Sequence, residues 1–339
     1  MFSKDAPFFI AEVGQNHQGD LDNALQFIEI FAHAGADAIK FQTRNNKFLF
    51  SDDAYNAPYN SENAFKPIYG QHREALELNL EWLPILKEEC RKFNVKFMST
   101  PFDEPSLEVL KNLDADILKI ASFDLGNLPF INRIAQSQIP VVISVGGGNY
   151  SQIDASVKIL LEQNVEVAVL HCVSEYPCEY DRLGLENIKK LIAAYPECTI
   201  GSSDHFNGIL SGPVAFMEGA RVFEKHVTLN RSWIGTDHSF ALERGGFTNF
   251  VRDIKRVPSM MPTKPKDEIG IEPVFMKLGK SLVSNQDIEP GDIFTLENLS
   301  GKIFQETFIP VRESNRVIGL KAKEGIKKGM PIPVSVLSQ

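Results

Sequence analysis

Two histidines of this chain each end a short, strand-like run of residues. His205 ends TIGSSDH, and His226 ends RVFEKH. Neighbouring parallel strands end at the same edge of a sheet, so the two imidazoles are expected to lie close together. They could hold a divalent metal and leave coordination positions for water and substrate. Two hydrogen-bonded histidines that share a cleft are the alternative, and the sequence contains no His-x-x-x-His motif that decides between them.

Two lysines interrupt apolar runs in a similar way. Lys40 lies in DAIKFQ, and Lys119 lies in DILKIAS. Burying an unpaired ammonium is costly, so each lysine needs a partner or a chemical role. Schiff-base chemistry is one role, binding of a phosphate or carboxylate is another, and an internal ion pair with Glu12 or Asp124 is the simplest alternative. The anion site is favoured because hydroxyl side chains lie at or near the ends of other runs: Thr100, Ser122, Ser144 and Ser203.

Carboxylates and a tyrosine complete the set of candidate side chains. Glu12 lies near the end of FFIAEV and could be a general acid or base, a metal ligand or a lysine partner. Asp237, in GTDHSF, could hold a polyol or transfer a proton, and Tyr176, in SEYPCEY, could line a sugar site. His171 ends VAVLH and is as consistent with a packed, hydrogen-bonded histidine as with a reactive one.

Most of these side chains lie at or near the end of a short, strand-like run, and Tyr176 and Asp237 lie on the loops that follow two of the runs. The eight runs are FFIAEV, DAIKFQ, VKFMST, DILKIAS, VVISV, VAVLH, TIGSSDH and RVFEKH. Helix-like segments alternate with them from about residue 8 to 257, which predicts a (β/α)8 barrel with its active site at the C-terminal ends of the strands. A doubly wound sheet is the alternative, but no strand is followed by Gly-x-Gly-x-x-Gly.

Composition shifts divide the chain. We predict a catalytic barrel over residues 1–257, a linker rich in proline and charge over 258–273, and a small β-rich domain with glycine turns over 274–339. Within the barrel, residues 44–79 form a long polar insertion, and loops of this length are usually lids or substrate loops.

Bulk properties exclude several classes of protein. The net charge is −9, which argues against a nucleic-acid partner. The four cysteines form no Cys-x-x-Cys pair and are expected to be reduced thiols. No signal-peptide pattern is present, and no run approaches the ~20 apolar residues of a membrane helix. We therefore expect a cytoplasmic protein that does not act on a membrane.

Motifs along nearly the whole chain, in the same order, carry a family likeness. They are AEVGQNHQGD, GADAIKFQT, FMSTPFD, LKIAS, VLHCVSEYP, GSSDH, EKHVTLNR and GTDHSFALE. Together they resemble the sialic acid synthase family, whose members condense phosphoenolpyruvate with an N-acylated hexosamine to a nine-carbon 2-keto acid. In the tail, SLVSNQDIEPGDIFTLENL and AKEGIKKGMPI resemble the family's small antifreeze-like (SAF) domain.

The resemblance implies a role for each candidate. Glu12 would handle protons, and His205 with His226 would hold a divalent metal that polarises the sugar aldehyde, typically Mn²⁺, with Mg²⁺ or Co²⁺ as alternatives. Phosphoenolpyruvate would be bound by Lys40, Thr100, Lys119, Ser122, Ser144 and Ser203. The amino sugar would contact Gln42, Tyr176 and Asp237. A homodimer with exchanged C-terminal domains is implied as well.

Some positions depart from the family pattern, mostly on the sugar side. Asp124 replaces a common Glu, and Ser174 replaces a frequent Asn. The tail segment GKIFQETFIP lacks the arginine that members usually offer to the neighbouring subunit, and Arg312 or Arg316 could substitute. The substrate sugar could therefore be N-acetylmannosamine or one of its relatives.

We thus predict a metal-dependent transferase that forms a carbon–carbon bond and makes a nonulosonic acid. A Schiff-base aldolase that uses Lys40 or Lys119 is the alternative enzyme. A non-catalytic protein that binds sugar phosphates is the alternative of another class.

Overall fold

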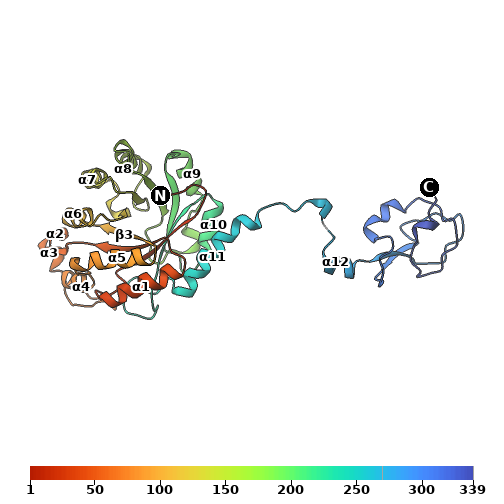
Figure 1. Ribbon diagram of the computed structural model, residues 1–339, viewed down its shortest axis with the longest axis horizontal. Helices are drawn as coiled ribbons and strands as arrows, with labels where there is room; N and C mark the ends of the chain where they lie inside the picture. Colours follow the sequence, from red (N-terminus) through yellow and green to blue (C-terminus); the bar gives the residue numbers. More distant parts are fainter. Residues whose placement is uncertain (269, 339) are drawn as a thin grey trace. The chain divides into compact units, whose positions relative to one another are not determined.

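The structure is a computed structural model that describes residues 1–268 and 270–338. The chain divides into two compact units, Met1–Met261 and a second that begins at Pro262 (Figure 1). Each unit is described by itself. Among the helices of the described ranges, none is both long and apolar enough to cross a membrane.

The first unit is a closed barrel of eight parallel strands whose order around the barrel follows the sequence. The strands are β1 (Phe8–Gly14), β2 (Ala38–Thr43), β3 (Lys96–Pro101), β4 (Ile117–Ile120), β5 (Val141–Ser144), β6 (Val167–Cys172), β7 (Thr199–Asp204) and β8 (Val222–His226). The predicted (β/α)8 barrel is confirmed. Each strand is a nearly continuous apolar run, because helices cover its outer face and side chains of the other strands cover its inner face.

A helix follows each strand and packs outside the barrel (Figure 1). These helices are α1 (Leu21–His33), α5 (Leu83–Lys92), α6 (Glu104–Asn112), α7 (Leu128–Gln136), α8 (Tyr150–Glu162), α9 (Asn187–Ala194), α10 (Ser211–Met217) and α11 (Arg244–Met260). The side chains of Asp20 and Asp103 cap α1 and α6 by accepting hydrogen bonds from backbone N–H groups, which fixes where these helices begin.

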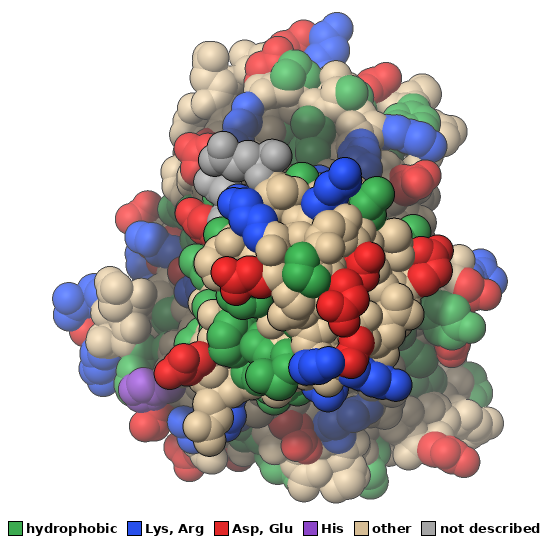
Figure 2. Space-filling model, turned by 90° about the vertical axis from the view of Figure 1, so that its right-hand side faces the viewer, with side chains coloured by type: hydrophobic (Ala, Val, Ile, Leu, Met, Phe, Trp, Pro, Cys, Tyr) green, Lys and Arg blue, Asp and Glu red, His purple; other side chains and the backbone are tan. Residues whose placement is uncertain are grey.

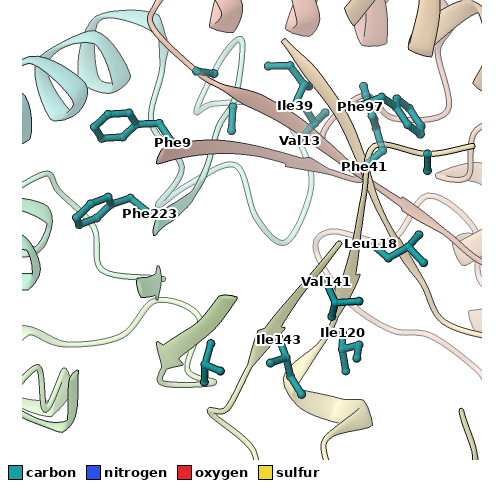
Figure 3. Close-up of a cluster of buried hydrophobic side chains, with 14 of the residues drawn as sticks. Phe9, Val13, Ile39, Phe41, Phe97, Leu118, Ile120, Val141, Ile143 and Phe223 are labelled. Atoms are coloured by element: carbon teal, nitrogen blue, oxygen red, sulfur yellow. The ribbon is translucent and has the colours of Figure 1, made fainter. Parts of the chain in front are cut away.

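The main hydrophobic core lies between the strands and the helices. Phe9, Phe41, Phe97 and Phe223 point outward from their strands into this layer and are almost fully buried (Figure 3). Burying one such side chain contributes about 1.5–3 kcal/mol. Because side chains alternate along a strand, the residues directly before and after each of these phenylalanines face the barrel interior.

Residues 44–79, expected as a long loop, contain three short helices: α2 (Asn46–Leu49), α3 (Asp52–Tyr55) and α4 (Tyr69–Ala75). The segment has a small interior of its own. The buried ring of His72 stacks on Tyr59 with centroids 4.5 Å apart, and its Nδ1 accepts a hydrogen bond from the backbone of Phe65 at 3.1 Å. The 3-10 helix η1 (Leu80–Trp82) connects the segment to α5.

The predicted end of the barrel at residue 257 is too early, because α11 continues to Met260 through Pro258. Val257 is buried, which keeps this last turn packed, and a proline near a helix end disrupts few hydrogen bonds. The rest of the predicted linker contains the 3-10 helix η4 (Lys266–Glu268), and α12 (Pro273–Leu278) begins at its end.

The second unit has a small two-stranded antiparallel sheet of β9 (Ser281–Ser284) and β10 (Leu299–Lys302). Isolated bridges such as Ile288 with Ile326, and the 3-10 helices η5 (Val311–Arg316) and η6 (Val334–Val336), complete it around a core that includes Phe294. Figure 2 shows acidic and basic side chains interspersed on the face that it displays, without a continuous basic surface.

Candidate active site

The polar groups of the barrel interior stand above an apolar floor. The floor consists of fully buried side chains from the strands: Ile10, Ala38, Met98, Ile117, Val142, Ala168, Leu170 and Val222. Strand side chains two positions apart face the same side. Glu12, Lys40, Lys119 and Glu224 each follow a floor residue by two positions and therefore point into the barrel, nearer the C-terminal ends of the strands.

A cavity of about 940 Å³ opens above this floor. Every residue that the sequence analysis assigned to the site lines it: Glu12, Lys40, Gln42, Thr100, Lys119, Ser122, Ser144, Tyr176, Ser203, His205, His226 and Asp237. Asp124 lines it too, whereas His171 and Ser174 are not among the described residues that do. The Nε2 atom of His171 lies 2.6 Å from the carbonyl oxygen of Leu183, which matches the packed alternative.

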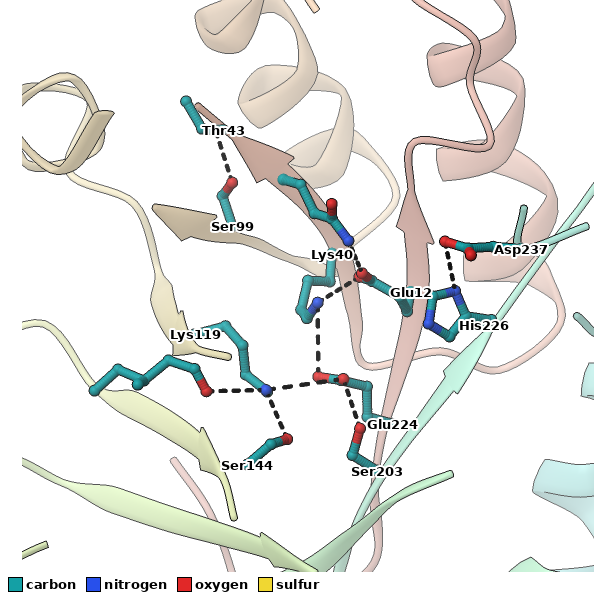
Figure 4. A network of polar contacts seen from close by, with 12 residues as sticks. Glu12, Lys40, Thr43, Ser99, Lys119, Ser144, Ser203, Glu224, His226 and Asp237 are labelled. Carbon is teal, nitrogen blue, oxygen red and sulfur yellow. Dashed lines mark hydrogen bonds and ion pairs between the residues drawn. The ribbon is translucent and has the colours of Figure 1, made fainter. Parts of the chain in front are cut away.

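Four buried charged side chains form one network at the bottom of the cavity (Figure 4). Lys40 Nζ lies 2.6 Å from Glu12 Oε2 and 3.8 Å from Glu224 Oε2. Lys119 Nζ lies 4.0 Å from Glu224 Oε1 and donates hydrogen bonds to Ser144 Oγ at 2.7 Å and to the carbonyl oxygen of Ile120 at 3.1 Å. The internal ion pair of Lys40 with Glu12, which the sequence analysis gave as the alternative to an anion site, is therefore present.

The partner of Lys119 is Glu224, and the suggested pair with Asp124 is wrong. Glu224 also accepts a hydrogen bond from Ser203 Oγ at 3.0 Å. Burial alone would raise the pKa of the Glu224 carboxyl, but Lys119 and Lys40 outweigh burial and hold that pKa well below its usual range. Burial lowers the pKa of Lys119, and Glu224 opposes this only in part.

Sequence reasoning missed Glu224, although a signal was available. It is a charged residue inside the strand that leads to His226, and it faces the same side as that histidine. The rule that identified Lys40 and Lys119 applies to it equally.

The two histidines face the cavity next to this network, with ring centroids 5.4 Å apart. The Nδ1 atom of His205 lies 2.8 Å from the carbonyl oxygen of Val173, so this nitrogen carries the proton and Nε2 is left to face a ligand. Burial, helped by the nearby His226, lowers the pKa of His205 to about 4. The neutral imidazole that results is the form that binds metals.

His226 is less constrained. Its Nδ1 atom has no hydrogen-bond partner within residues 1–268 and 270–338, and Asp237 Oδ2 lies 3.8 Å away. In a metal-binding histidine, the ring nitrogen that does not hold the metal typically faces a carboxylate. The pair thus fits a metal held by two imidazoles, although the described chain contains no cluster of three or more His, Cys, Asp or Glu able to hold a metal.

Comparison with known proteins establishes the family. Residues 27–266 match the family described as NeuB. This chain belongs to the NeuB family. The resemblance of the barrel motifs to the sialic acid synthase family is therefore confirmed.

Relatives of this NeuB chain include N-acetylneuraminate-9-phosphate synthase of Homo sapiens, 32% identical over 315 residues that cover 93% of this chain and 88% of the relative. N,N'-diacetyllegionaminic acid synthase of Campylobacter jejuni is 34% identical over 303 residues, 86% of this chain and 89% of the relative. Among solved structures, the N-acetylneuraminic acid (sialic acid) synthetase of Leptospira borgpetersenii, in complex with citrate, is 33% identical. It covers 80% of this chain and 88% of its own, with a TM-score of 0.69.

In this NeuB chain, the register of the strands places Glu12 between β2, which carries Lys40, and β8, which carries His226. The register pairs Glu12 with Lys40 on β2 and with His226 on β8. The backbone of Glu12 therefore lies between the strand that carries Lys40 and the strand that carries His226.

The insertion contributes the outer wall of the cavity in this family member. Leu49, Phe50, Asn63, Tyr69 and Arg73 line it. At the join between insertion and barrel, Arg44 also lines the cavity and pairs with Glu77 at 2.9 Å. The sequence analysis noted the insertion but not these two arginines, because nothing in a loop sequence shows which side chains turn inward.

Tyr176 is partly exposed and covers His205, with ring centroids 3.9 Å apart. Asp124 accepts a hydrogen bond from Asn127 at 3.0 Å, and burial raises the pKa of its carboxyl. Both residues line the cavity.

Proposed function

We propose that this chain is a nonulosonic acid synthase, which condenses phosphoenolpyruvate with the open-chain aldehyde of an N-acylated hexosamine and releases phosphate. The sugar would be N-acetylmannosamine or a relative. One observation carries the proposal: two buried lysines, a carboxylate that touches one of them, and two adjacent histidines line a single cavity. The relatives named as synthases of sialic and legionaminic acids support it.

Phosphoenolpyruvate is a multiply charged anion and needs cationic and hydroxyl donors. Lys40 and Lys119 would supply the charge, and Thr100, Ser122, Ser144 and Ser203 would supply hydroxyls. Each ammonium has three N–H donors, so a lysine can keep its carboxylate partner and still bind the ligand. Held in this way, C3 of phosphoenolpyruvate lies within reach of the sugar aldehyde.

The proposed reaction forms one carbon–carbon bond and breaks the C2–O bond to phosphate. C3 of phosphoenolpyruvate forms a bond to the aldehyde carbon, and the aldehyde oxygen takes a proton and becomes a hydroxyl. Water adds to C2 and loses one proton, which leaves a hydroxyl at C2. The C2–O bond to phosphate then breaks as that hydroxyl gives its proton to the departing phosphate, and the 2-keto acid remains. Glu12 is the proposed base for the proton that the water loses. Its Oε2 lies 2.6 Å from Lys40 Nζ and accepts no hydrogen bond from the other described residues.

His205 and His226 would hold a divalent metal, proposed to be Mn²⁺ with Mg²⁺ or Co²⁺ as alternatives, and the bound metal would be a Lewis acid for the aldehyde oxygen. Gln42, Tyr176 and Asp237 would contact the sugar. The Val173 carbonyl fixes the tautomer of His205, so one nitrogen faces the cavity whatever ligand is bound.

We also propose that the second unit is an SAF domain, that the enzyme is a cytoplasmic homodimer, and that each subunit's tail covers its partner's site. The two candidate arginines of the tail make contacts within their own unit. Arg312 donates to the Gly270 carbonyl oxygen at 3.1 Å, and Arg316 pairs with Glu313. Arg312 is the better candidate to replace the missing arginine, because a carbonyl is a weaker competitor than a carboxylate.

The test is a substrate panel. Phosphate release from phosphoenolpyruvate is measured with N-acetylmannosamine, its 6-phosphate and 2,4-diacetamido sugars, and products are identified by mass. Release with at least one sugar and a nine-carbon product is expected. No release with any sugar would contradict the proposal.

The aldolase alternative has one supporting observation, the lowered pKa of Lys119, because a Schiff-base lysine must lose its proton. Borohydride reduction in the presence of pyruvate separates the two enzymes. The synthase forms no covalent adduct, and an adduct at Lys40 or Lys119 would establish the aldolase.

A further inference from the structure

The orientation of the Gln42 side chain depends on a residue outside the expected site. Gln42 Nε2 donates a hydrogen bond to Glu12 Oε1 at 2.8 Å, and its Oε1 accepts one from Arg44 Nη2. A guanidinium carries only donors, so the amide oxygen must face Arg44. The amide NH₂ then has to face Glu12.

Arg44 is itself held on three sides. Its Nη1 lies 2.9 Å from Glu77 Oε1, and its guanidinium carbon lies 4.3 Å from the ring centroid of Phe102. Gln15 donates to the same Glu77 oxygen at 2.8 Å. The Arg44 side chain is only 3% exposed, so solvent does not compete for it. A planar guanidinium group that binds a carboxylate with one nitrogen and an amide with another has little freedom to rotate.

We propose that Arg44, anchored by Glu77, is a positioning residue that orients the Gln42 amide so that it donates to Glu12. The carboxylate of Glu12 then has a fixed contact at each oxygen, Gln42 at Oε1 and Lys40 at Oε2. Without Arg44, the amide can present its oxygen to Glu12, which repels the carboxylate and turns it away from the reacting atoms. Glu77 follows α4, so the inner end of the insertion is joined to the proposed base through three side chains.

The inference rests on the proposed function, and a double-mutant cycle tests it. Variants Q42L, R44M and Q42L/R44M are compared with the wild type for kcat and for the KM of phosphoenolpyruvate. Each single change should lower kcat about tenfold, with the KM of phosphoenolpyruvate within about twofold. If Arg44 acts through Gln42, the double variant is no slower than Q42L alone. Independent, multiplicative losses would overturn the inference, as would an R44M enzyme with unchanged kcat.

The matched control is R91M, because Arg91 is an exposed arginine of α5 whose partner, Glu88, is exposed as well. It should behave as the wild type. Removing Arg44 leaves Glu77 without its cation and could prevent folding. R44K then replaces R44M in the cycle, since a lysine keeps the charge but cannot bind Glu77 and Gln42 in the same planar geometry. It should lose less activity than R44M does and show the same non-additivity with Q42L.

A readout independent of turnover separates this inference from the proposed function. The side-chain amide resonance of Gln42, assigned by its loss in Q42L, should shift in R44M or R44K and stay in place in R91M. An unshifted resonance would contradict the positioning role. A wild-type chain that is inactive with every sugar would count against the proposed function, and the amide resonance would still decide the role of Arg44.

Discussion

Lys40 Nζ lies 2.6 Å from Glu12 Oε2, and the two side chains are only 4% and 2% exposed. A buried ion pair of this kind is strongly destabilising when one partner is removed, because the remaining charge is left without compensation. Here Lys40 also lies 3.8 Å from Glu224, so its loss affects two carboxylates.

We therefore expect K40M to lower the free energy of unfolding by about 3–5 kcal/mol. Urea denaturation followed by circular dichroism measures this change. The control is K92M, which removes the exposed lysine of the Lys92–Glu89 surface pair and should leave stability nearly unchanged. A K40M variant as stable as K92M would show that the network contributes little.

The E224Q variant should reveal a pH-dependent contribution. The pKa of the Glu224 carboxyl is lowered from its ordinary value of 4.5, because Lys119 and Lys40 outweigh burial. Such a group stabilises the folded state above its unfolded pKa and loses this effect as the pH falls toward its folded pKa.

The difference in unfolding free energy between wild type and E224Q should thus be largest near neutral pH and shrink at pH values below about 4.5. Urea titrations at several pH values measure it, with E88Q, at an exposed position, as the control. A difference that is independent of pH would mean that Glu224 is not ionised in the folded chain.

Metal binding should depend on His205 and His226. Isothermal titration with Mn²⁺ should show one site in the wild type, and no site in H205N or H226N. H33N is the matched control, since His33 is exposed on α1. Chelation should abolish turnover, and added Mn²⁺ should restore it. Full activity in the presence of chelator would exclude the proposed metal.

Arg73 should affect the sugar and not phosphoenolpyruvate. It comes from α4 and lines the cavity, and its Nε is buried without a hydrogen-bond partner in the part of the chain that the structure describes. R73M should raise the KM of the sugar about tenfold and leave the KM of phosphoenolpyruvate within about twofold. Steady-state kinetics with each substrate varied in turn measure this, and equal increases for both substrates would contradict the assignment.

Much of the site could be predicted because one physical rule identifies it. A charged residue in a buried strand needs a reason, and this rule found Lys40 and Lys119. Glu224 meets the same rule but was missed, because the next residue is also charged. Lys225 points to the other side of β8 and pairs there with Asp204 at 2.6 Å, so the strand does not read as a single apolar run.

The contacts of Gln42 could not be predicted in the same way. Its two partners, Glu12 and Arg44, come from a strand end and from the start of the insertion, and only the folded insertion brings Glu77 to Arg44. Helices within 44–79 were missed for a related reason, since short helices depend on tertiary contacts such as the stacking of His72 on Tyr59.

The apolar floor of the barrel has a consequence for the order of events. All of its side chains are 0% exposed, so solvent does not reach the cavity from below. Ligands must arrive and depart through the mouth at the C-terminal ends of the strands. A ligand held by the lysines just above the floor therefore has to enter before a second ligand closes the mouth above it. Whatever is formed from the first ligand and stays at the lysines can leave only after the second ligand has moved away.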